Sequence, residues 1–516
     1  MSAGGQRTTP RTDAPTDAPH EPGGQGPEQA VAPRSLVANS TWLLSSRLVG
    51  LVFGAALSIY AIRQLSVADW GHYSAIVSLV AIFGIFTEAG VSSLTVREIA
   101  THPERAPAVL SLATSAVALS AFVSLLLMLA VSFVLGYAMA WPALVALGAC
   151  LVATQGLAVP LYAIFNARRA FSYTAVIAGV VVPVAAVIGA PLVALGLGPP
   201  ALLIGALVGQ LTSAVVGHAL VRKRLGMSLG LRWPRGPTLR FMQTAAPIAA
   251  TGGLTIVYQR LDILMLSKLA GAAEVAAYAV PYSLLQYSWM VPSAVAAAFF
   301  PVLSDTLRRD AERARYLFFL LVRLFFLAIV PGAIFLAVAS KPILTTVFGD
   351  KYAASASTLA ILAAVVVLAA QNYVLWYGIF AGRKEGLVVG VQVAGLAVNA
   401  ALNLALIPAF GAEGAASALV VSELVVTAGQ AWIVHRWVFP IPWAAIFVRL
   451  LLASAAAAVV IVALLPVGRL VAAVVGPAAC LLVLVVTGYV PRHEWAPLRE
   501  PVRRSIARWR TASARP

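Results

Sequence analysis

Long apolar stretches alternate with short polar segments along almost the whole chain after its first 35 residues. Most stretches hold 20 or more residues, and a helix of 20 residues rises about 30 Å, enough to cross the hydrocarbon core of a membrane. The pattern therefore predicts an all-α polytopic membrane protein with about 14 transmembrane helices. The predicted helices span residues 36–62, 72–96, 106–136, 141–167, 173–196, 199–221, 238–267, 274–301, 316–340, 355–381, 386–408, 411–435, 443–466 and 468–490.

One segment of the sequence occurs twice. Tyr162–Arg169 reads Tyr-Ala-Ile-Phe-Asn-Ala-Arg-Arg, and Tyr377–Lys384, 215 residues later, reads Tyr-Gly-Ile-Phe-Ala-Gly-Arg-Lys. Each copy closes an apolar stretch with two cations, and very short turns at 199–200 and 411–414 also fall at matching places. Duplicated halves are typical of transporters that rock one half against the other around a central site. The repeat predicts two pseudo-symmetric six-helix bundles.

The division of the chain follows from this repeat. The last two apolar stretches have no counterpart in it and are predicted to form an additional helix pair. The first residues are rich in Pro, Gly, Asp, Thr and Arg and contain no apolar segment, which is typical of disorder. The predicted regions are a disordered cytoplasmic tail (1–35), an N-terminal bundle (36–222), a basic cytoplasmic linker (223–237), a C-terminal bundle (238–436), the extra helix pair (437–490) and a basic cytoplasmic tail (491–516).

Composition agrees with a membrane environment. The chain is 61% hydrophobic and 11% charged, so lipid must cover part of its apolar surface. Its net charge of +17 does not indicate a nucleic-acid partner, because the cations lie at the ends of apolar stretches. They are concentrated on one side, which predicts that both termini are cytoplasmic, and the abundance of Arg, Ala and Val suggests a bacterial plasma membrane.

The sequence contains no motif for an enzyme. It has no phosphate-binding loop and no His or Cys cluster with metal-ligand spacing, and its loops are short. Cys150 and Cys480 lie far apart within apolar stretches and are interpreted as packing residues. We expect no catalytic residue, no metal and no cofactor, although coupling to a proton or sodium ion stays open.

Several ionisable residues lie at membrane depth, where they are costly and therefore candidates for function. Each could instead form an interhelical salt bridge or a satisfied hydrogen bond. Because Arg260 and Asp262 are two positions apart, they point to nearly opposite sides of a helix and cannot simply neutralise each other. A guanidinium can bind phosphate with two parallel hydrogen bonds. The candidates are Arg47, Glu88, Arg260, Asp262, Arg323 and Glu423. Glu88 and Glu423 are candidate ion-coupling groups, and Asp262 is a candidate substrate-binding residue that could also be an ion site.

Uncharged polar and aromatic residues form three stripes in the second half of the chain. Amides and aromatic rings suit a sugar through hydrogen bonds and ring stacking, and they equally suit helix packing. The stripes are Tyr278, Tyr282, Gln286 and Trp289; Gln371, Asn372, Trp376 and Tyr377; and Gln392, Gly395, Asn399 and Asn403.

Some of these residues belong to motifs of a known family. The chain resembles the polysaccharide flippases of the Wzx type, within the multidrug/oligosaccharidyl-lipid/polysaccharide exporter superfamily, over residues 36–440. The resemblance is carried by Ala61-Ile-Arg63-Gln-Leu65, Gly71-His-Tyr73, Glu88-Ala-Gly90, Arg97-Glu98, Arg260-Leu-Asp262, Tyr278, Phe300-Pro301, Phe348-Gly349-Asp-Lys-Tyr352, Asn399, Asn403, Pro408 and Gly411-Ala-Glu-Gly414.

The resemblance implies two six-helix bundles around a central cavity, and alternating access. It implies a polyprenyl-pyrophosphate-linked oligosaccharide as substrate, moved from the cytoplasmic to the outer leaflet for surface polysaccharide export. Arg47 and Arg260 would then bind the pyrophosphate, and the polar and aromatic stripes would surround the sugars. Membrane lipid and the glycan polymerase or glycosyltransferases of the same pathway are the expected partners.

Three other functions stay open. A lipid II flippase would share the fold. A multidrug or small-molecule antiporter would need a cluster of carboxylates, whereas Glu88, Asp262 and Glu423 are dispersed. A membrane glycosyltransferase or glycan polymerase would need an acidic metal-binding motif or a large external loop, and the sequence shows neither.

Overall fold

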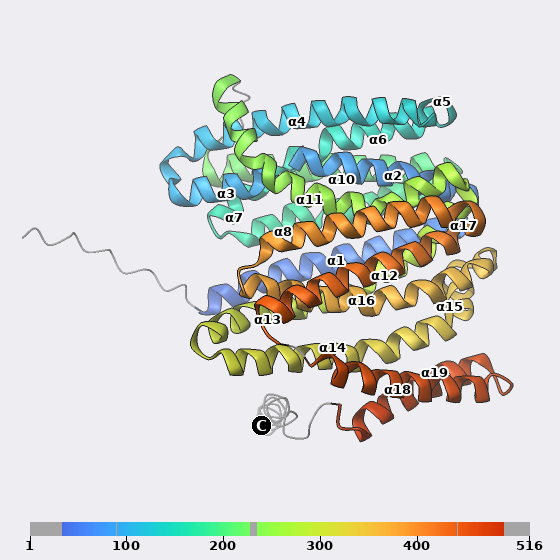
Figure 1. The fold of residues 1–516 in the computed structure, drawn as a ribbon. Helices are drawn as coiled ribbons and strands as arrows, with labels where there is room; N and C mark the ends of the chain where they lie inside the picture. The colour runs from blue at the N-terminus through green and yellow to red at the C-terminus, as the bar shows by residue number, and fades with distance from the viewer. Residues whose placement is uncertain (1–32, 89, 228–234, 441, 490–516) are drawn as a thin grey trace, which may run out of the picture.

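The computed structural model describes residues 33–88, 90–227, 235–440 and 442–489, and every regular element within them is a helix. The helices run side by side between two ends of the molecule (Figure 1). The α-helices are α1 (Pro33–Gln64), α2 (Val67–Glu88), α3 (Val91–Thr101), α4 (Ala106–Val134), α5 (Tyr137–Ala140), α6 (Pro142–Gln155), α7 (Val159–Ala167), α8 (Phe171–Gly179), α9 (Val181–Ala194), α10 (Pro199–Leu225), α11 (Arg235–Leu269), α12 (Ala272–Ser288), α13 (Met290–Arg309), α14 (Ala311–Val338), α15 (Ser340–Phe348), α16 (Ala356–Ala381), α17 (Glu385–Trp437), α18 (Trp443–Leu464) and α19 (Arg469–Val486). Three 3-10 helices, η1 (Pro103–Arg105), η2 (Gly156–Ala158) and η3 (Asp350–Ser355), connect some of them.

The prediction of an all-α, multi-pass membrane protein is confirmed. In the described part of the chain, twelve helical segments are long and apolar enough to cross a membrane. One of them, the 53-residue α17, breaks at Gly411, whose φ of 51° and ψ of −127° are non-helical. The backbone of Gly414 lies against that of Leu406, so the chain reverses there and α17 provides two legs. With α17 counted twice, these segments correspond to thirteen of the fourteen predicted spans. The remaining one, 238–267, coincides with α11, which is not among the twelve segments.

Three predicted boundaries differ from the observed helix ends. α1 begins at Pro33, inside the predicted tail, α10 continues to Leu225, and α11 already begins at Arg235. The basic linker is therefore shorter than predicted, because helical structure enters it from both sides. The predicted C-terminal tail, 491–516, lies outside the described residues.

The repeat is visible in the backbone with a register that differs by one residue. At the first copy the amide of Ala170 donates to Phe165 O, and at the second the amide of Lys384 donates to Ile379 O. The residue before each of these donors, Arg169 and Arg383, has a left-handed φ of 55°. The equivalent turns are thus 214 residues apart, whereas the matching letters are 215 apart.

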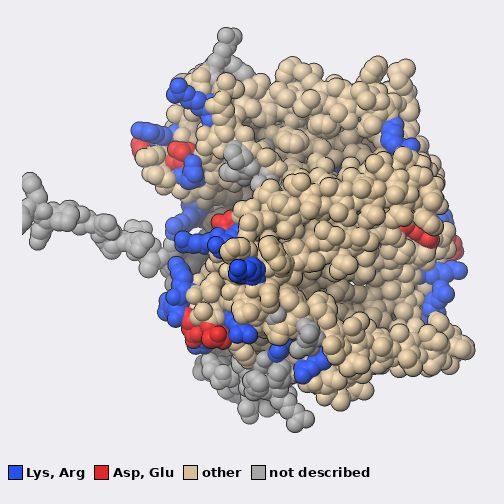
Figure 2. Space-filling view, in the orientation of Figure 1, with Lys and Arg blue, Asp and Glu red and all other residues tan. Residues whose placement is uncertain are grey.

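Lys and Arg side chains gather at one end of the molecule, where the chain enters α1 (Figure 2). We call this end, which includes residues 97–105, 168–169, 222–224 and 308–315, the basic end. The opposite end, called the far end, contains the end of α1, the start of α2, α15, η3 and the reversal at Gly411.

The N-terminal and C-terminal halves pack against each other through α2, which contacts both α11 and α12. The approach is close at Gly71, where a Cβ atom would come within 1.9 Å of the carbonyl oxygen of Ala272. One hydrophobic core cluster continues across this boundary, since it contains Ile62 and Trp70 of the first half with Leu266 of the second. The pair α18 and α19 packs on α14 at the edge of the second half.

Candidate functional site: a polar and aromatic chamber in the second half

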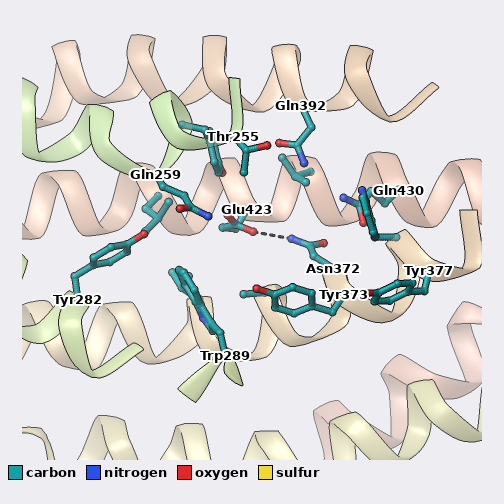
Figure 3. Close-up of a pocket in the computed structure, with 16 residues that line it drawn as sticks. Thr255, Gln259, Tyr282, Trp289, Asn372, Tyr373, Tyr377, Gln392, Glu423 and Gln430 are labelled. Atoms are coloured by element: carbon teal, nitrogen blue, oxygen red, sulfur yellow. Dashed lines mark hydrogen bonds between the residues drawn. The ribbon is translucent and has the colours of Figure 1, made fainter. Parts of the chain in front are cut away.

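A cavity of about 290 Å³ lies within the C-terminal half, between α11, α12, α16 and α17 (Figure 3). We call it the chamber. Its lining combines aromatic rings, amides and one carboxylate. The lining residues are Thr255, Tyr258, Gln259, Tyr282, Trp289, Val365, Ala369, Asn372, Tyr373, Trp376, Tyr377, Gln392, Leu419, Glu423, Val426 and Gln430.

Helical periodicity brings these side chains together. On α16 the positions 365, 369, 372, 373, 376 and 377 recur every three or four residues, and so do 419, 423, 426 and 430 on the second leg of α17. Residues at this spacing share one face of a helix. Two helices that face each other therefore supply ten of the sixteen lining residues, and the other six come from α11, α12, the α12–α13 junction and the first leg of α17.

Glu423 is held in a fixed orientation at the wall of the chamber. The Nδ2 group of Asn372 donates to its Oε2 atom at 2.6 Å, and the hydroxyl of Thr427 donates to Asn372 Oδ1 at 2.9 Å. Figure 3 shows the Glu423 and Asn372 side chains meeting between Tyr373 and Gln259. A half-buried carboxylate that is anchored by an amide remains an acceptor for further donors, because each of its oxygens has two lone pairs.

Aromatic rings form the opposite wall. Tyr282 meets Trp289 edge to face at 5.8 Å between centroids and stacks on Tyr278 at 5.5 Å. The indole Nε1 of Trp289 and Oε1 of Gln430 are buried and have no hydrogen-bond partner among the described residues. Buried polar atoms are normally paired, so a donor and an acceptor are left for a ligand.

Asp262 lies outside the chamber lining, in a closed polar network. It is 1% exposed and accepts from the hydroxyl of Tyr278 and from Asn403 Nδ2, both at 2.6 Å. Asn403 also donates to Asn399 Oδ1 at 3.0 Å. Tyr278 and Asn403, both predicted to bind substrate, thus satisfy Asp262, and Asn399 joins the network through Asn403. The predicted role of these three residues in binding stays a prediction.

Arg260 lies on α11 apart from Asp262, as the two-residue spacing requires. Its Nε is buried without a hydrogen-bond partner in the part of the chain that the structure describes. It lies near Tyr73 in α2 and Tyr282 in α12, where the two halves meet, next to one wall of the chamber. From this position Arg260 could bind a ligand that extends from the chamber to the boundary between the two halves.

The other predicted site residues divide between the chamber and the surface. Tyr282, Trp376, Tyr377 and Glu423 line the chamber. Arg47 is exposed on α1, and Glu88 is exposed at the end of α2, just before the left-handed Gly90. Neither Arg47 nor Glu88 is part of the lining.

Sequence reasoning missed several lining residues, namely Thr255, Tyr258, Gln259, Tyr373 and Gln430. A signal existed for three of them. Thr255 and Gln259 are four positions apart on α11, and Gln430 follows Glu423 by seven, so each pair shares a helix face.

The far end is closed by hydrogen bonds between the halves. Arg63 donates through Nε to Val347 O at 2.8 Å and through Nη2 to Thr346 O. In return Lys351 Nζ donates to Arg63 O at 2.9 Å and to Leu65 O at 2.5 Å. Each cation satisfies carbonyls at the C-terminal end of a helix in the other half, where the helix dipole is negative.

A third cation repeats this arrangement. Lys268, near the end of α11, donates to Leu135 O just after α4 and lies 4.1 Å from the ring centroid of Tyr137. The hydroxyl of Tyr137 is in turn hydrogen-bonded to Ser267. Three of the few cations at this end therefore join the N-terminal half to the C-terminal half.

Among the described residues no group of three His, Cys, Asp or Glu could hold a metal ion.

Comparison with known protein families shows to which family the chain belongs. Residues 62–357, more than half of the chain, match the family model described as "Polysaccharide biosynthesis protein". The chain belongs to the polysaccharide biosynthesis protein family. The predicted resemblance to polysaccharide flippases is thereby confirmed at the level of the family.

Two curated relatives are similar to this family member over part of their length. It is 24% identical over 240 residues to the probable low-salt glycan biosynthesis flippase Agl15 of Haloferax volcanii, covering 46% of this chain and 49% of that one. It is 29% identical over 268 residues to the probable lipid II flippase MurJ of Rhizobium meliloti, covering 48% and 49%. The chain thus matches about half the length of these relatives.

Solved structures show the same fold over most of the molecule. Lipid II flippase MurJ in an inward closed conformation superposes with a TM-score of 0.64 and 16% identity, over 87% of this chain and 98% of that one. An inward-facing multidrug resistance MATE family transporter of the MOP superfamily superposes with a TM-score of 0.59 and 12% identity, over 74% and 93%. At these identities the likeness establishes the polytopic transporter fold alone.

Proposed function

We propose that this family member is a flippase that moves a polyprenyl-pyrophosphate-linked oligosaccharide from the cytoplasmic to the outer leaflet of the bacterial plasma membrane by alternating access. The observation that carries the proposal is the chamber beside Arg260. A sugar-compatible cavity and a guanidinium at the boundary of the halves match the two polar parts of such a substrate. The polyprenyl chain needs no polar partner and would stay in the bilayer.

Different residues would bind the sugars and the pyrophosphate of the substrate. Trp376, Tyr377 and Tyr282 offer ring faces to the sugars, while the amides of Gln259, Gln392 and Gln430 offer hydrogen bonds to hydroxyls. Arg260 would hold the pyrophosphate with the two parallel hydrogen bonds that a guanidinium offers. Arg47 on α1 stays a second candidate for phosphate, at the exposed face of the first half.

Alternating access would require the closed far end to open. Opening the far end would break the cation–carbonyl bonds of Arg63, Lys268 and Lys351 and separate α2 from α12. The glycan polymerase or glycosyltransferases of the pathway would take up the released lipid. In this scheme the basic end and both termini are cytoplasmic, in keeping with the positive-inside rule.

Ion coupling is proposed at one of two carboxylates. Asp262 is buried between two helices of the same half, and Glu423 faces the chamber, so a proton or sodium ion bound at either would change a charge next to the substrate. Glu88 stays a third candidate. Consumption of the flipped lipid could drive transport without an ion, and transport with and without a proton or sodium gradient separates these schemes.

Deletion of the gene followed by mass spectrometry of the lipid-linked oligosaccharide pool tests the function. Accumulation of one complete lipid-linked repeat on the cytoplasmic face, with loss of one surface polymer, is the expected result and names the glycan. Accumulation of lipid II would instead support the second candidate, a lipid II flippase, which the similarity to the Rhizobium meliloti protein favours. An unchanged lipid pool with altered drug sensitivity would indicate an antiporter.

A further inference from the structure

The only charged group on the chamber wall is acidic. Among the sixteen lining residues Glu423 is the single carboxylate, and none is Lys, Arg or His. Six of the others are aromatic and four carry amides. The nearest cation described above, Arg260, is not part of this lining and lies behind the wall formed by Tyr282, toward α2.

We infer that the chamber selects glycan units that carry no carboxylate, and that Glu423 is the residue that determines this specificity. The inference rests on the proposed function and adds to it the chemical class of the sugar. Uncharged sugars and sugars with a protonated amine are accepted, and uronic-acid-type sugars are rejected. The pyrophosphate is held outside the chamber, at Arg260.

The rejection of an acidic sugar has a direct physical cause. Asn372 fixes the Glu423 carboxylate in place, so it cannot swing away from a second carboxylate that enters the cavity. Like charges placed together in a partly desolvated site are strongly unfavourable, and no lining cation compensates the incoming charge. A specific site commonly combines attraction for one ligand with repulsion of another.

The acceptance of uncharged and amino sugars has its own basis. The unpartnered indole N–H of Trp289 and the unpartnered Oε1 of Gln430 offer one donor and one acceptor for sugar hydroxyls. The faces of Trp376 and Tyr377 suit the apolar faces of sugar rings. A protonated amine gains both the carboxylate of Glu423 and cation–π contacts with the surrounding rings.

Binding of three small glycosides to the full chain in detergent tests the inference. The probes are methyl glycosides of glucose, glucosamine and glucuronic acid, which share a ring and differ in charge, and saturation-transfer NMR at pH 7, where the glucosaminide is mostly protonated, measures weak affinities. We expect the glucuronide to bind roughly tenfold or more weakly than the glucoside, and the glucosaminide at least as tightly as the glucoside. Glu423→Gln keeps the size and the acceptor oxygen of the side chain. In this variant the affinity for the glucuronide should approach the affinity for the glucoside.

A matched control is available at the far end, where Glu413 is exposed and outside the chamber and accepts a hydrogen bond from Ser357. Glu413→Gln should leave all three affinities unchanged. Equal binding of the glucuronide and the glucoside to the wild-type chain would overturn the inference, and so would an unaltered ratio in Glu423→Gln when glucoside binding shows that the variant is folded.

The same titrations separate failure of the inference from failure of the proposed function. Flipping of the lipid-linked oligosaccharide without any of these affinities would refute the inference alone. The expected affinities without flipping in liposomes would refute the flippase function and leave the chamber as a saccharide site. Tetraphenylphosphonium displacing the glucoside at far lower concentration than any sugar would refute the glycan assignment in favour of organic cations.

Discussion

The guanidinium of Arg260 and the carboxylate of Asp262 are close in sequence and have opposite surroundings. Asp262 is enclosed by donors from Tyr278 and Asn403, whereas the buried Nε of Arg260 has no such partner among the described residues. A buried N–H group of a guanidinium without a hydrogen bond is costly unless a ligand supplies the acceptor. Asp262 is therefore interpreted as a structural group, and Arg260 as a candidate binding group.

Replacement of Arg260 tests its assignment to the pyrophosphate. Arg260→Ala should lower the flipping rate of a lipid-linked oligosaccharide in proteoliposomes by roughly tenfold or more, because hydrogen bonds to charged groups contribute about 1.5–3 kcal/mol. Arg260→Lys keeps the charge and loses the planar fork, so it should recover part of the rate. Arg308→Ala, which removes an exposed arginine at the basic end, is the control. Full activity of Arg260→Ala at normal membrane abundance would assign Arg260 to packing.

Asn403 leads to a different prediction, because its partner is a buried carboxylate. Asn403→Ala removes a 2.6 Å donor to Asp262, so the folded state should lose about 1.5–3 kcal/mol, and thermal unfolding in detergent should show a lower Tm. Gln392→Ala changes a chamber residue with no such hydrogen bond among the described residues, and its Tm should match the wild type. Equal Tm values for the two variants would argue against the network as a stabilising feature.

At the scale of helices, the far end is joined by side chains that act on helix ends. Arg63 and Lys351 are reciprocal, since each donates to carbonyls of the segment that carries the other. Neither bond involves a carboxylate, so changes in pH that titrate Asp or Glu do not break it. Loss of these bonds should favour the conformation in which the far end is open.

The combined variant Arg63→Gln/Lys351→Gln tests this closure. Spin labels at the exposed Leu197 and Glu413 mark the far ends of the two halves, and electron-electron resonance reports the distance between them. We expect the population with the longer distance to rise roughly tenfold, as a loss of about 1.4 kcal/mol produces. Lys341→Gln, an exposed cation at the same end, is the control. An unchanged distance distribution would show that the packing of α2 on α12 closes the far end by itself.

The helices and the chamber differ in how far the sequence predicts them. Apolar length was sufficient for most of the spans, and the polar and aromatic cluster predicted in the tenth span includes Trp376 and Tyr377, which line the chamber. The same spacing put Asn399 and Asn403 on a single face, yet that face meets Asp262, 141 residues before Asn403. Contacts between distant helices depend on packing, and single-sequence periodicity does not contain that information.

The repeat shows the same limit on a larger element. The letters of the two copies align at 215 residues, and the left-handed turns at Arg169 and Arg383 align at 214. The backbone hydrogen bonds define the turn, and the side chains at its surface are free to shift by one position. A sequence repeat therefore located the two halves and misplaced their structural register by one residue.

For the whole molecule, the distribution of charge predicts how it lies in the membrane. Lys and Arg are gathered at the basic end, and the far end has few, three of which are used for bonds between the halves. We expect the basic end to lie on the cytoplasmic side, because loops rich in Lys and Arg are retained there. The direction of transport depends on this orientation, since it decides which leaflet faces the closed end.

Labelling of single cysteines from outside the cell measures the orientation directly. In a chain whose Cys150 and Cys480 are replaced by Ala, Glu413→Cys at the far end should react with a membrane-impermeant maleimide in intact spheroplasts. Arg308→Cys at the basic end should react after the membrane is opened. The reverse pattern would place the closed far end toward the cytoplasm. Because both positions are exposed and lie outside the chamber and the far-end bonds, neither substitution removes a contact on which the proposed transport depends.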